Sequence, residues 1–423
     1  EENLTLDQFA VLYRTNAQSR VFEESMRKRG LPYRIYGGLS FYQRKEIKDA
    51  IAYFRIVINP HDEEAFKRIV NYPARGIGKV TQDKILEMAT QNGVSLWVVL
   101  KNPQSYQLSL NKGALNRLLE FKQLIDSFII EGTESNAYDL ALRIIKETGL
   151  LTDIIKDTSP ESMSRKENLE ELLNGINDFC TSREEEGNEQ IYLSDFLSEV
   201  SLLTDQDTGD EEERKITLMT IHSAKGLEFK NVFVVGMEEN LFPSGMSGYS
   251  PNALEEERRL FYVAITRAEE NCFLSYAKSR FRYGKTEPGI PSRFLKEIDA
   301  EFMDMPETFT LRSSIDRSSR QFRTSTINVQ SQGGSLFDKD TRTKQTSIPT
   351  RSLRRVKAVP VTDSSTSSIP ELTSGQTIEH ERFGIGEVIS VEGVGDNAKA
   401  KIQFKHAGEK QLLLRFARFK VLD

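Results

Sequence analysis

Hydrophobic and polar positions alternate with a strand or a helix period along the first 60 residues. The stretch "QFAVLYRT" at 8–15 holds a short apolar run that predicts a strand, and "NAQSRVFEESMRKRG" at 16–30 predicts a helix. A second strand at 32–38 and a second helix at 44–58 follow. The second helix has an apolar stripe made of Ile47, Ile51, Phe54 and Ile58. This β-α-β-α rhythm predicts a parallel sheet.

The rhythm then changes, because nearly all periodic segments from about 60 to 205 are helical. Strand patterns return at 215–222 and 230–236, and a helix at 253–269 and a strand at 271–277 follow. The first two strands are too few to close a core, so the later strands are expected to complete the same sheet. The pattern therefore predicts one α/β domain with an all-helical insertion.

The last third of the chain predicts two further parts. Residues 311–372 are poor in aromatic side chains and rich in Ser, Thr, Gln and Arg, which predicts a disordered linker. That stretch holds 11 Lys and Arg against 5 Asp and Glu, a net charge of +6. After it, 374–423 sets short strand patterns between Gly-rich turns, which predicts a small SH3-like β-barrel.

Composition excludes several classes of protein. No apolar run approaches the roughly 18–20 residues of a membrane span, and the first residues lack the layout of a signal peptide. Two distant cysteines predict no disulfide framework, and four scattered histidines give no zinc spacing. We therefore expect a cytoplasmic protein with no metal site of its own and no membrane partner. The net charge of −6 argues weakly against nucleic acid, but the basic 311–372 stretch leaves −12 for the rest.

The stretch "VAITRAEE" at 263–270 places an arginine where the pattern predicts an apolar helix face. Leu260, Val263, Ala264 and Arg267 fall at i, i+3, i+4 and i+7 of the predicted helix. A guanidinium stays charged in proteins, and burying it without a partner is expensive. Arg267 therefore needs an anion, either a carboxylate of this chain or the phosphate of a ligand.

No stretch of the chain forms a phosphate loop. The sequence "GKT" at 284–286 resembles the end of a P-loop motif. A P-loop needs glycine five positions earlier, where this chain has Ser279, and the following "EPGIP" cannot begin a helix. The turn "RGIGK" at 75–79 lacks a leading strand and the third glycine of a dinucleotide fingerprint. Gly76 and Gly78 could offer backbone N–H groups to a DNA phosphate, or could simply make a tight turn between helices. If Arg267 binds a ligand phosphate, a second protein part must supply the loop that holds the phosphates.

Three long blocks together resemble one family. They are "FAVLYRTNAQSR" at 9–20, "ITLMTIHSAKGLEFKNVFVVGMEENLFP" at 216–243 and "EEERRLFYVAITRAEE" at 255–270. In order and spacing they resemble motifs IV, V and VI of superfamily-one DNA helicases of the UvrD/PcrA type. The tail resembles the Tudor-like C-terminal domain of PcrA-type members. The resemblance covers nearly all of residues 1–300.

The resemblance implies a RecA-like parallel-sheet domain, interrupted by the family's 2B insertion and followed by a linker and a Tudor-like barrel. The expected divisions are 1–105 and 213–305 for the two parts of the second RecA-like domain (2A), 106–212 for the insertion, 306–373 for the disordered basic linker and 374–423 for the barrel. The first RecA-like domain of the family, with its Walker A and B motifs, does not occur in this sequence.

The resemblance further implies ATP-driven 3′-to-5′ translocation on single-stranded DNA and unwinding of duplex DNA. ATP and Mg²⁺ would be held mainly by the absent RecA-like domain, so the chain alone is expected to hydrolyse no ATP. The family's partners would be single-stranded and duplex DNA, and RNA polymerase through the barrel.

In family terms four residues face the nucleotide. Arg267 would be the arginine finger that stabilises charge on the γ-phosphate, with Arg14 as its partner. Tyr13 would stack on adenine, and Glu228 would accept a hydrogen bond from the ribose. Each residue also has a purely structural alternative. Arg267 could pair with a core carboxylate, Arg14 could end a strand, Tyr13 could be part of the core and Glu228 could cap a helix.

Thr220 and His222 would meet the DNA backbone by the same resemblance, although a lone histidine is often structural. Where family members carry a Gly-rich turn that contacts duplex DNA, the stretch at 106–121 keeps only Gly113, which departs from the family's pattern. The main rival function is a stand-alone module that binds DNA or RNA polymerase without ATPase activity. A helicase fused to a nuclease is disfavoured, because the tail is short and lacks an Asp/Glu–Lys nuclease pattern.

Overall fold

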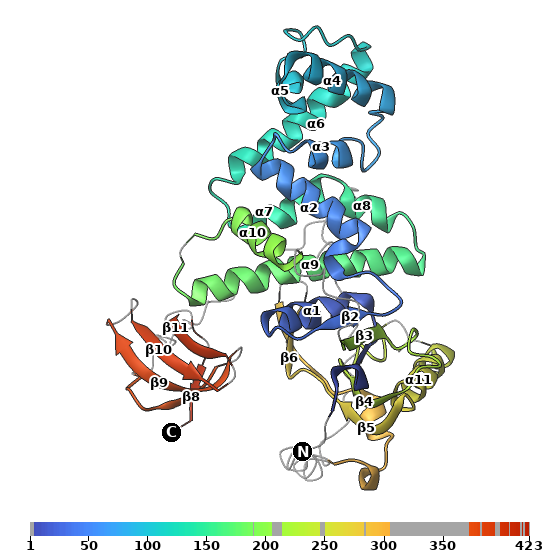
Figure 1. Cartoon of the computed structure of the whole chain (residues 1–423), viewed down its shortest axis with the longest axis vertical. Helices are drawn as coiled ribbons and strands as arrows, with labels where there is room; N and C mark the ends of the chain where they lie inside the picture. Colours follow the sequence, from blue (N-terminus) through green and yellow to red (C-terminus); the bar gives the residue numbers. More distant parts are fainter. Residues whose placement is uncertain are drawn as a thin grey trace, which may run out of the picture.

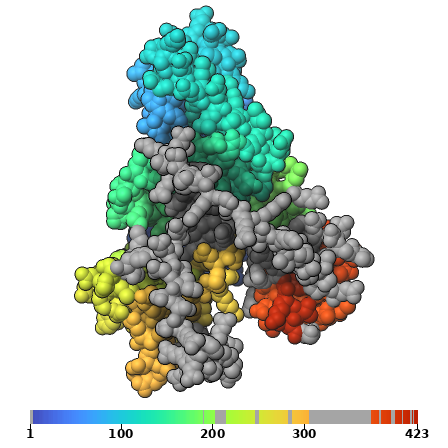
Figure 2. Space-filling view, turned by 180° about the vertical axis from the view of Figure 1, so that it is seen from behind, coloured from blue at the N-terminus to red at the C-terminus, as the bar shows by residue number. Residues whose placement is uncertain are grey.

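The computed structural model of the chain shows a parallel sheet with its helices, an all-helical part, and a small antiparallel β domain beside them (Figure 1). It describes residues 4–188, 190–204, 214–245, 250–282, 285–304 and 372–422, the last range with gaps at 381–382, 394–397, 406, 415–416 and 418. Nearly all of the predicted linker at 306–373 lies outside the described residues. The same three parts are recognisable from behind (Figure 2).

The parallel sheet has the strand order β2-β3-β1-β4-β5. Its strands are β1 (Phe9–Tyr13), β2 (Tyr33–Ile35), β3 (Ile216–Thr220), β4 (Phe229–Val234) and β5 (Ala268–Leu274). Strand β1 lies between β3 and β4, although more than 200 residues separate them in sequence. The prediction that late strands complete the sheet begun by the first two is confirmed, and the helical part is inserted between β2 and β3.

Alternate residues of β1 face opposite sides of the sheet. Ala10 and Leu12 belong to the buried cluster that includes Phe261 of α11 (Pro251–Ile265), whereas Val11 and Tyr13 face α1 (Ser19–Lys28). Such two-sided burial is the rule for parallel sheets. Short 3₁₀ turns, η1 (Leu6–Gln8), η2 (Asn16–Gln18) and η3 (Phe41–Gln43), flank these elements.

The all-helical part has one continuous buried core that runs from Phe41 to Val200. Its helices are α2 (Lys45–Ile58), α3 (Glu63–Ile69), α4 (Lys79–Asn92), α5 (Leu96–Lys101), α6 (Lys112–Glu131), α7 (Ala137–Glu147), α8 (Leu150–Ile155), α9 (Pro160–Glu185) and α10 (Leu193–Thr204). The core is continuous across residue 106, where the sequence predicts a domain boundary, and that boundary stays a prediction.

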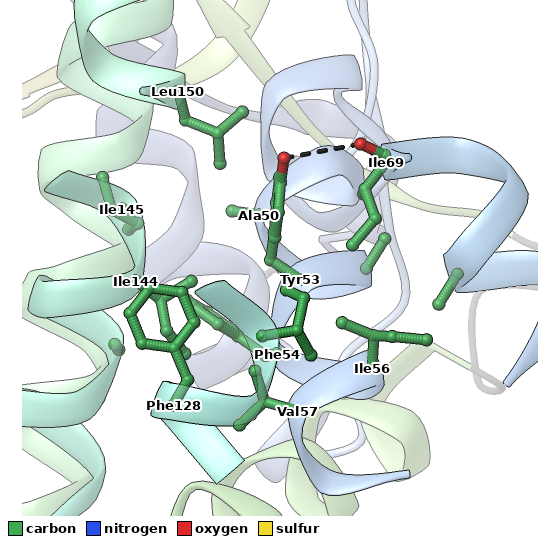
Figure 3. Close-up of a cluster of buried hydrophobic side chains, with 14 of the residues drawn as sticks. Ala50, Tyr53, Phe54, Ile56, Val57, Ile69, Phe128, Ile144, Ile145 and Leu150 are labelled. Atoms are coloured by element: carbon green, nitrogen blue, oxygen red, sulfur yellow. Dashed lines mark hydrogen bonds between the residues drawn. The ribbon is translucent and has the colours of Figure 1, made fainter. Parts of the chain in front are cut away.

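Helix α2 is buried on more than one side. Ala50, Tyr53, Phe54 and Val57 pack with residues of α6, α7 and α8 (Figure 3). Ile58 belongs to the predicted apolar stripe but is not buried, since it is 42% exposed. The phenol of Tyr53 donates a hydrogen bond to Tyr72 O at 2.6 Å and to Ile69 O at 3.4 Å. The helix therefore packs within the helical part.

Charged side chains join the helical part to the sheet part. Arg20 of α1 is only 3% exposed, and its guanidinium donates to Glu171 (2.8 Å) and Asp178 (3.2 Å) of α9 and to Glu24 (3.0 Å). Gly175 of α9 makes the close approach possible, because a Cβ there would lie 2.9 Å from Arg20 Nη1. The buried guanidinium is thus compensated by three carboxylates from two helices.

The antiparallel β domain has the strand order β11-β10-β9-β8-β12 and a buried core of its own that includes Ile378, Val388, Ile402 and Phe404. Its strands are β8 (Thr377–His380), β9 (Gly384–Glu392), β10 (Lys399–Phe404), β11 (Gly408–Leu413) and β12 (Phe419–Val421). This agrees with the small barrel-like tail that the sequence predicts. Buried His380 lies 3.8 Å from Glu185 at the end of α9, so the tail domain contacts the helical part.

Between the parallel sheet and the tail lie a hairpin of β6 (Ser279–Arg282) and β7 (Lys285–Pro288) and two 3₁₀ turns, η6 (Arg293–Lys296) and η7 (Ala300–Phe302). Residues 285–288 thus form a strand, in agreement with the exclusion of a P-loop there. No helix within the described residues has the length and apolar character needed to cross a bilayer.

Candidate functional site

Four of the predicted site residues lie where β1 and β3 end. Tyr13 pairs with Thr220 in the parallel ladder, and Ile221 N donates to Tyr13 O at 3.0 Å. Arg14 follows β1 directly, and His222 follows β3 by two residues. The sheet therefore gathers Arg14, Thr220 and His222 at its carboxyl edge, where open α/β sheets usually bind ligands.

Thr220 is tied into the turn that follows β3. Its Oγ1 lies 2.9 Å from Ser223 Oγ and accepts from Ser223 N at 3.3 Å. Gly37, from the loop after β2, approaches the same turn with a φ of +73°, and a Cβ there would lie 2.8 Å from Ser223 Oγ. Two loops from distant parts of the sequence thus pack together at this edge.

Arg14 makes an ion pair that the sequence did not reveal. Its Nε donates to both carboxylate oxygens of Glu257 (3.1 and 3.0 Å), and its Nη2 donates to Oε1 at 2.7 Å. Glu257, on α11, is 5% exposed and also accepts from Ser244 N at 3.4 Å. The Arg14 side chain is 22% exposed, so the pair lies at the boundary between protein interior and solvent.

His222 lies within the electrostatic reach of this pair. Loss of surrounding water lowers the pKa of its imidazole, and the charge of Arg14 lowers the pKa further. The carboxylate of Glu257 acts in the opposite direction and raises it. The imidazole is accordingly neutral near pH 7 and is exposed, so it can donate or accept a hydrogen bond without carrying a charge.

Tyr13 is almost completely buried, with 1% of its surface exposed. It packs with Val11, Leu218 and Val235 on the face of the sheet that α1 covers. Burial raises the pKa of its phenol well above the ordinary value. In this conformation the ring offers no free face to a base, so stacking on adenine would require it to move, and that role stays a prediction.

Arg267 lies just beyond α11 and not on it, because the helix ends at Ile265 and β5 begins at Ala268. The predicted helix at 253–269 is therefore too long at its C-terminal end, and Arg267 does not occupy an apolar helical face. Its backbone oxygen accepts from Phe229 N at 2.9 Å, which fixes the start of the β4–β5 ladder.

The guanidinium of Arg267 is held by neutral oxygen atoms. Nε donates to Val263 O (3.1 Å), Nη1 to Leu227 O (3.0 Å) and Nη2 to Thr266 Oγ1 (3.2 Å). Within the described part of the chain no carboxylate forms an ion pair with it. Its orientation is therefore fixed while its positive charge stays uncompensated.

The backbones of Arg14 and Arg267 lie at opposite ends of the sheet. Leu12 pairs with Val234 and Phe229 pairs with Ala268, so roughly 17 Å or more of strand separates the two backbones at ~3.3 Å per residue. Both side chains reach α11, Arg14 at Glu257 and Arg267 at the Val263 carbonyl. Glu228, which is exposed, lies on the Arg267 side, next to the Leu227 carbonyl that Arg267 binds.

Gly76 and Gly78 lie far from the sheet, in the turn before α4 near the opposite end of the molecule (Figure 1). Gly76 has a φ of +71°, and a Cβ there would lie 3.2 Å from Nε of Arg117 on α6. Gly78 is the N-cap of α4 and is exposed, as are Lys79 and Val80. The turn combines exposed backbone with a nearby cation, which suits a phosphate.

Sequence reasoning missed Glu257, although a signal was present. Three glutamates follow one another at 255–257, and only Glu257 shares the helical face of Phe261 and Ala264, at i, i+4 and i+7. These three residues are the buried ones of α11. A charged residue at an apolar period indicates a buried partner of opposite charge.

The sequence of this chain matches the models of two known protein families. The family described as "UvrD-like helicase C-terminal domain" matches residues 1–279, and "PcrA/UvrD tudor domain" matches residues 374–420. The first match covers both parts of the parallel sheet and the helical part between them. The second covers the antiparallel tail domain.

Individual relatives agree with the family matches. DNA helicase II of Salmonella typhimurium is 36% identical over 417 residues, which is 99% of this chain and 52% of that protein. ATP-dependent DNA helicase PcrA of Leuconostoc citreum is 36% identical over 425 residues, which is all of this chain and 54% of that protein. PcrA of Staphylococcus epidermidis is 35% identical over 412 residues. The chain spans about half the length of these relatives.

Proposed function

Because the chain belongs to the family of UvrD-like helicase C-terminal domains, we propose that it is the C-terminal half of an ATP-dependent DNA helicase. In this proposal the relatives' additional length corresponds to a RecA-like domain that carries the Walker A and B motifs and holds most of the ATP and its Mg²⁺. This chain supplies the opposite wall of the nucleotide site. Residues 1–105 and 213–305 form the second RecA-like domain, and 106–212 form its insertion.

The observation that carries the proposal is the uncompensated charge of Arg267. Its guanidinium is oriented by two carbonyls and a hydroxyl, and no carboxylate of the described residues neutralises it. Phosphoryl transfer spreads negative charge over the γ-phosphate oxygens, and a pre-oriented cation stabilises that charge with little reorganisation. Arg267 fits this role, which supports its assignment as the arginine finger.

The remaining nucleotide contacts come from both ends of the sheet. Arg14 approaches the phosphates from the carboxyl edge, and exposed Glu228 accepts a hydrogen bond from the ribose beside Arg267. Tyr13 stacks on adenine after its ring leaves the pocket under α1. Because Arg14 and Arg267 follow different strand ends of the same domain, we propose that closure of the two RecA-like domains brings ATP against both guanidinium groups, which approach the phosphates from different sides.

DNA contacts are proposed in two places. Thr220 and His222 contact the backbone of single-stranded DNA, where the hydroxyl and the neutral imidazole can hydrogen-bond to phosphate and sugar oxygens. The exposed turn with Gly76 and Gly78 contacts duplex DNA through backbone N–H groups and Arg117. The two places lie toward opposite ends of the molecule (Figure 1), so that in this proposal one holds the single strand and the other holds the duplex.

Strand displacement by the complete protein tests the proposal. We expect ATP-dependent unwinding of a duplex with a 3′ single-stranded tail and little unwinding of the same duplex with a 5′ tail. The 423-residue chain alone should bind DNA without hydrolysing ATP. Unwinding from the 5′ tail would overturn the direction, and DNA binding by the complete protein without ATP turnover would favour the rival, a module that only binds.

The tail domain is proposed as a docking module for RNA polymerase. On β9, Ile385 and Ile389 are 39% and 43% exposed. Lys401 of β10 lies in register with Ser390 and forms an ion pair with Glu409 at 2.8 Å. Exposed apolar side chains beside an ion pair suit a protein partner. Capture of polymerase by the tail at high salt supports this, whereas binding of duplex DNA that weakens steeply with salt would make the tail a DNA clamp.

A further inference from the structure

Glu257 is a buried carboxylate on a helix whose other glutamates at this point are exposed. Glu255 and Glu256 are 55% and 69% exposed at their side chains, whereas Glu257 is 6% exposed. Removing a carboxylate from water is costly unless a cation and hydrogen bonds compensate it. Glu257 must therefore be held in place by its partner, and the partner is Arg14.

The contact with Glu257 uses one edge of the Arg14 guanidinium. Nε and Nη2 make the bonds to the carboxylate, at 2.7 to 3.1 Å. A guanidinium has five N–H groups in a rigid planar fork. Nη1 donates to no described residue, and with the side chain 22% exposed this edge is open to a ligand. The carboxylate thus fixes the plane of the guanidinium and leaves its other edge available.

We propose that Glu257 is a positioning residue for Arg14 that holds one edge of the guanidinium so that the Nη1 edge meets the terminal phosphate of ATP. The inference rests on the proposed function, because the phosphate is the ligand of the open edge. An arginine without such a partner samples many rotamers. Holding it before the reaction removes that cost from the transition state.

The pair also has a consequence for ATP binding. Arg14 and Glu257 together carry no net charge, so the pair attracts the polyanionic nucleotide only weakly in the ground state. The directional bond from Nη1 gains strength as charge develops on the phosphate. Glu257→Gln should therefore lower kcat while it leaves KM for ATP unchanged or lowers it, because the change removes a negative charge near the phosphates.

Kinetics of the complete helicase test the proposal with four variants: Glu257→Gln, Arg14→Ala, the double variant, and the control Glu256→Gln. A misplacement of about 1 Å can cost about 100-fold in rate, so we expect Glu257→Gln to lower kcat of DNA-stimulated ATPase roughly 10- to 100-fold. The double variant should match Arg14→Ala in kcat, because Glu257 acts through Arg14. Glu256 lies one residue away on the exposed face of the helix, so Glu256→Gln should leave kcat unchanged.

The outcomes separate this inference from the proposed function. If Arg14→Ala lowers kcat strongly while Glu257→Gln leaves kcat unchanged, Arg14 acts on ATP without Glu257 and the inference is wrong. If Glu257→Gln lowers kcat further in the Arg14→Ala background, Glu257 does not act through Arg14, and the inference is again wrong. If Arg14→Ala itself keeps normal kcat, the assignment of Arg14 to the nucleotide fails, whatever Glu257 does.

Discussion

Arg20 and Arg267 belong to the same sheet domain, yet the charge of Arg20 is compensated by carboxylates and that of Arg267, within the described chain, is not. Arg20 is buried between α1 and α9 and is surrounded by Glu24, Glu171 and Asp178. Arg267 is held at the end of α11 by carbonyl and hydroxyl oxygens, with no carboxylate partner among the described residues. Arg14 is intermediate, since one carboxylate takes one edge of its guanidinium.

The difference separates structural arginines from arginines that can act on a ligand. A cation whose charge is compensated within the chain contributes to stability, and its removal leaves buried carboxylates without a partner. A cation that is oriented but not compensated retains its full attraction for an incoming anion. We therefore expect loss of activity and loss of stability to follow opposite orders among these arginines.

The largest expected effect is on catalysis at Arg267. In the complete helicase, Arg267→Ala should lower kcat about 10³-fold or more, the range that arginine fingers reach in phosphoryl transfer. KM for ATP should change far less, because the charge acts mainly in the transition state. Steady-state ATPase assays with DNA in excess measure both quantities. Arg259→Ala is the matched control, since Arg259 lies on α11, the helix that precedes Arg267, is 72% exposed and pairs with exposed Glu256.

A near-normal kcat for Arg267→Ala would return Arg267 to a structural role. Its three hydrogen bonds would then serve to join α11 to the loop before β4 and no more. In that case the thermal midpoint of unfolding, and not the rate of hydrolysis, would show the change.

The second effect is on stability at Arg20. Removing one partner of a buried ion pair typically costs about 3–5 kcal/mol, and the partly exposed carboxylates here favour the lower end, about 3 kcal/mol. Arg20→Ala should therefore lower the apparent unfolding midpoint by roughly 6–12 °C in a thermal melt. The kcat of the complete helicase should stay within about threefold of normal below that temperature. A large loss of kcat in folded protein would mean that the contact between α1 and α9 controls the motor as well as its stability.

The smallest effect concerns the pH response of His222. Its pKa is lowered in the folded chain by partial loss of surrounding water and by Arg14, so the unfolded chain binds the proton more readily. Stability should therefore fall as the pH drops through the ordinary histidine value of about 6.5, and only by a few tenths of a kcal/mol, since the residue is exposed. NMR titration should show the His222 pKa rise in Arg14→Ala. An unchanged pKa would mean that Arg14 does not lie near His222 in solution.

Local patterns of the sequence predicted most of the fold. The short apolar run in "FAVLY" and helical periodicity in the insertion were enough to place the strands and helices, because both depend on burial of neighbouring residues. The end of α11 was misjudged by a few residues. Helical periodicity continues to Arg267, but Ala268 pairs with Phe229, so β5 begins after only two intervening residues.

The candidate site was harder to predict, since its key contacts join residues far apart in sequence. The pair of Arg14 with Glu257 spans 243 positions, and no local pattern could specify it. Tyr13 shows a second limit: the strand period predicts which face of β1 it occupies, but not that its side chain is almost completely buried there. The position of Arg267 likewise depends on where α11 ends, because Arg267 lies at the start of β5, at the edge of the sheet opposite to Arg14.

The central claim is that the charge of Arg267 acts on the transition state of phosphoryl transfer. Binding of ADP with aluminium fluoride, which mimics that state, tests it most directly in the complete helicase. We expect Arg267→Ala to weaken binding of ADP–aluminium fluoride by about 100-fold or more, while binding of ADP alone changes by less than about threefold. Equal weakening of both ligands, or no weakening of either, would contradict the account.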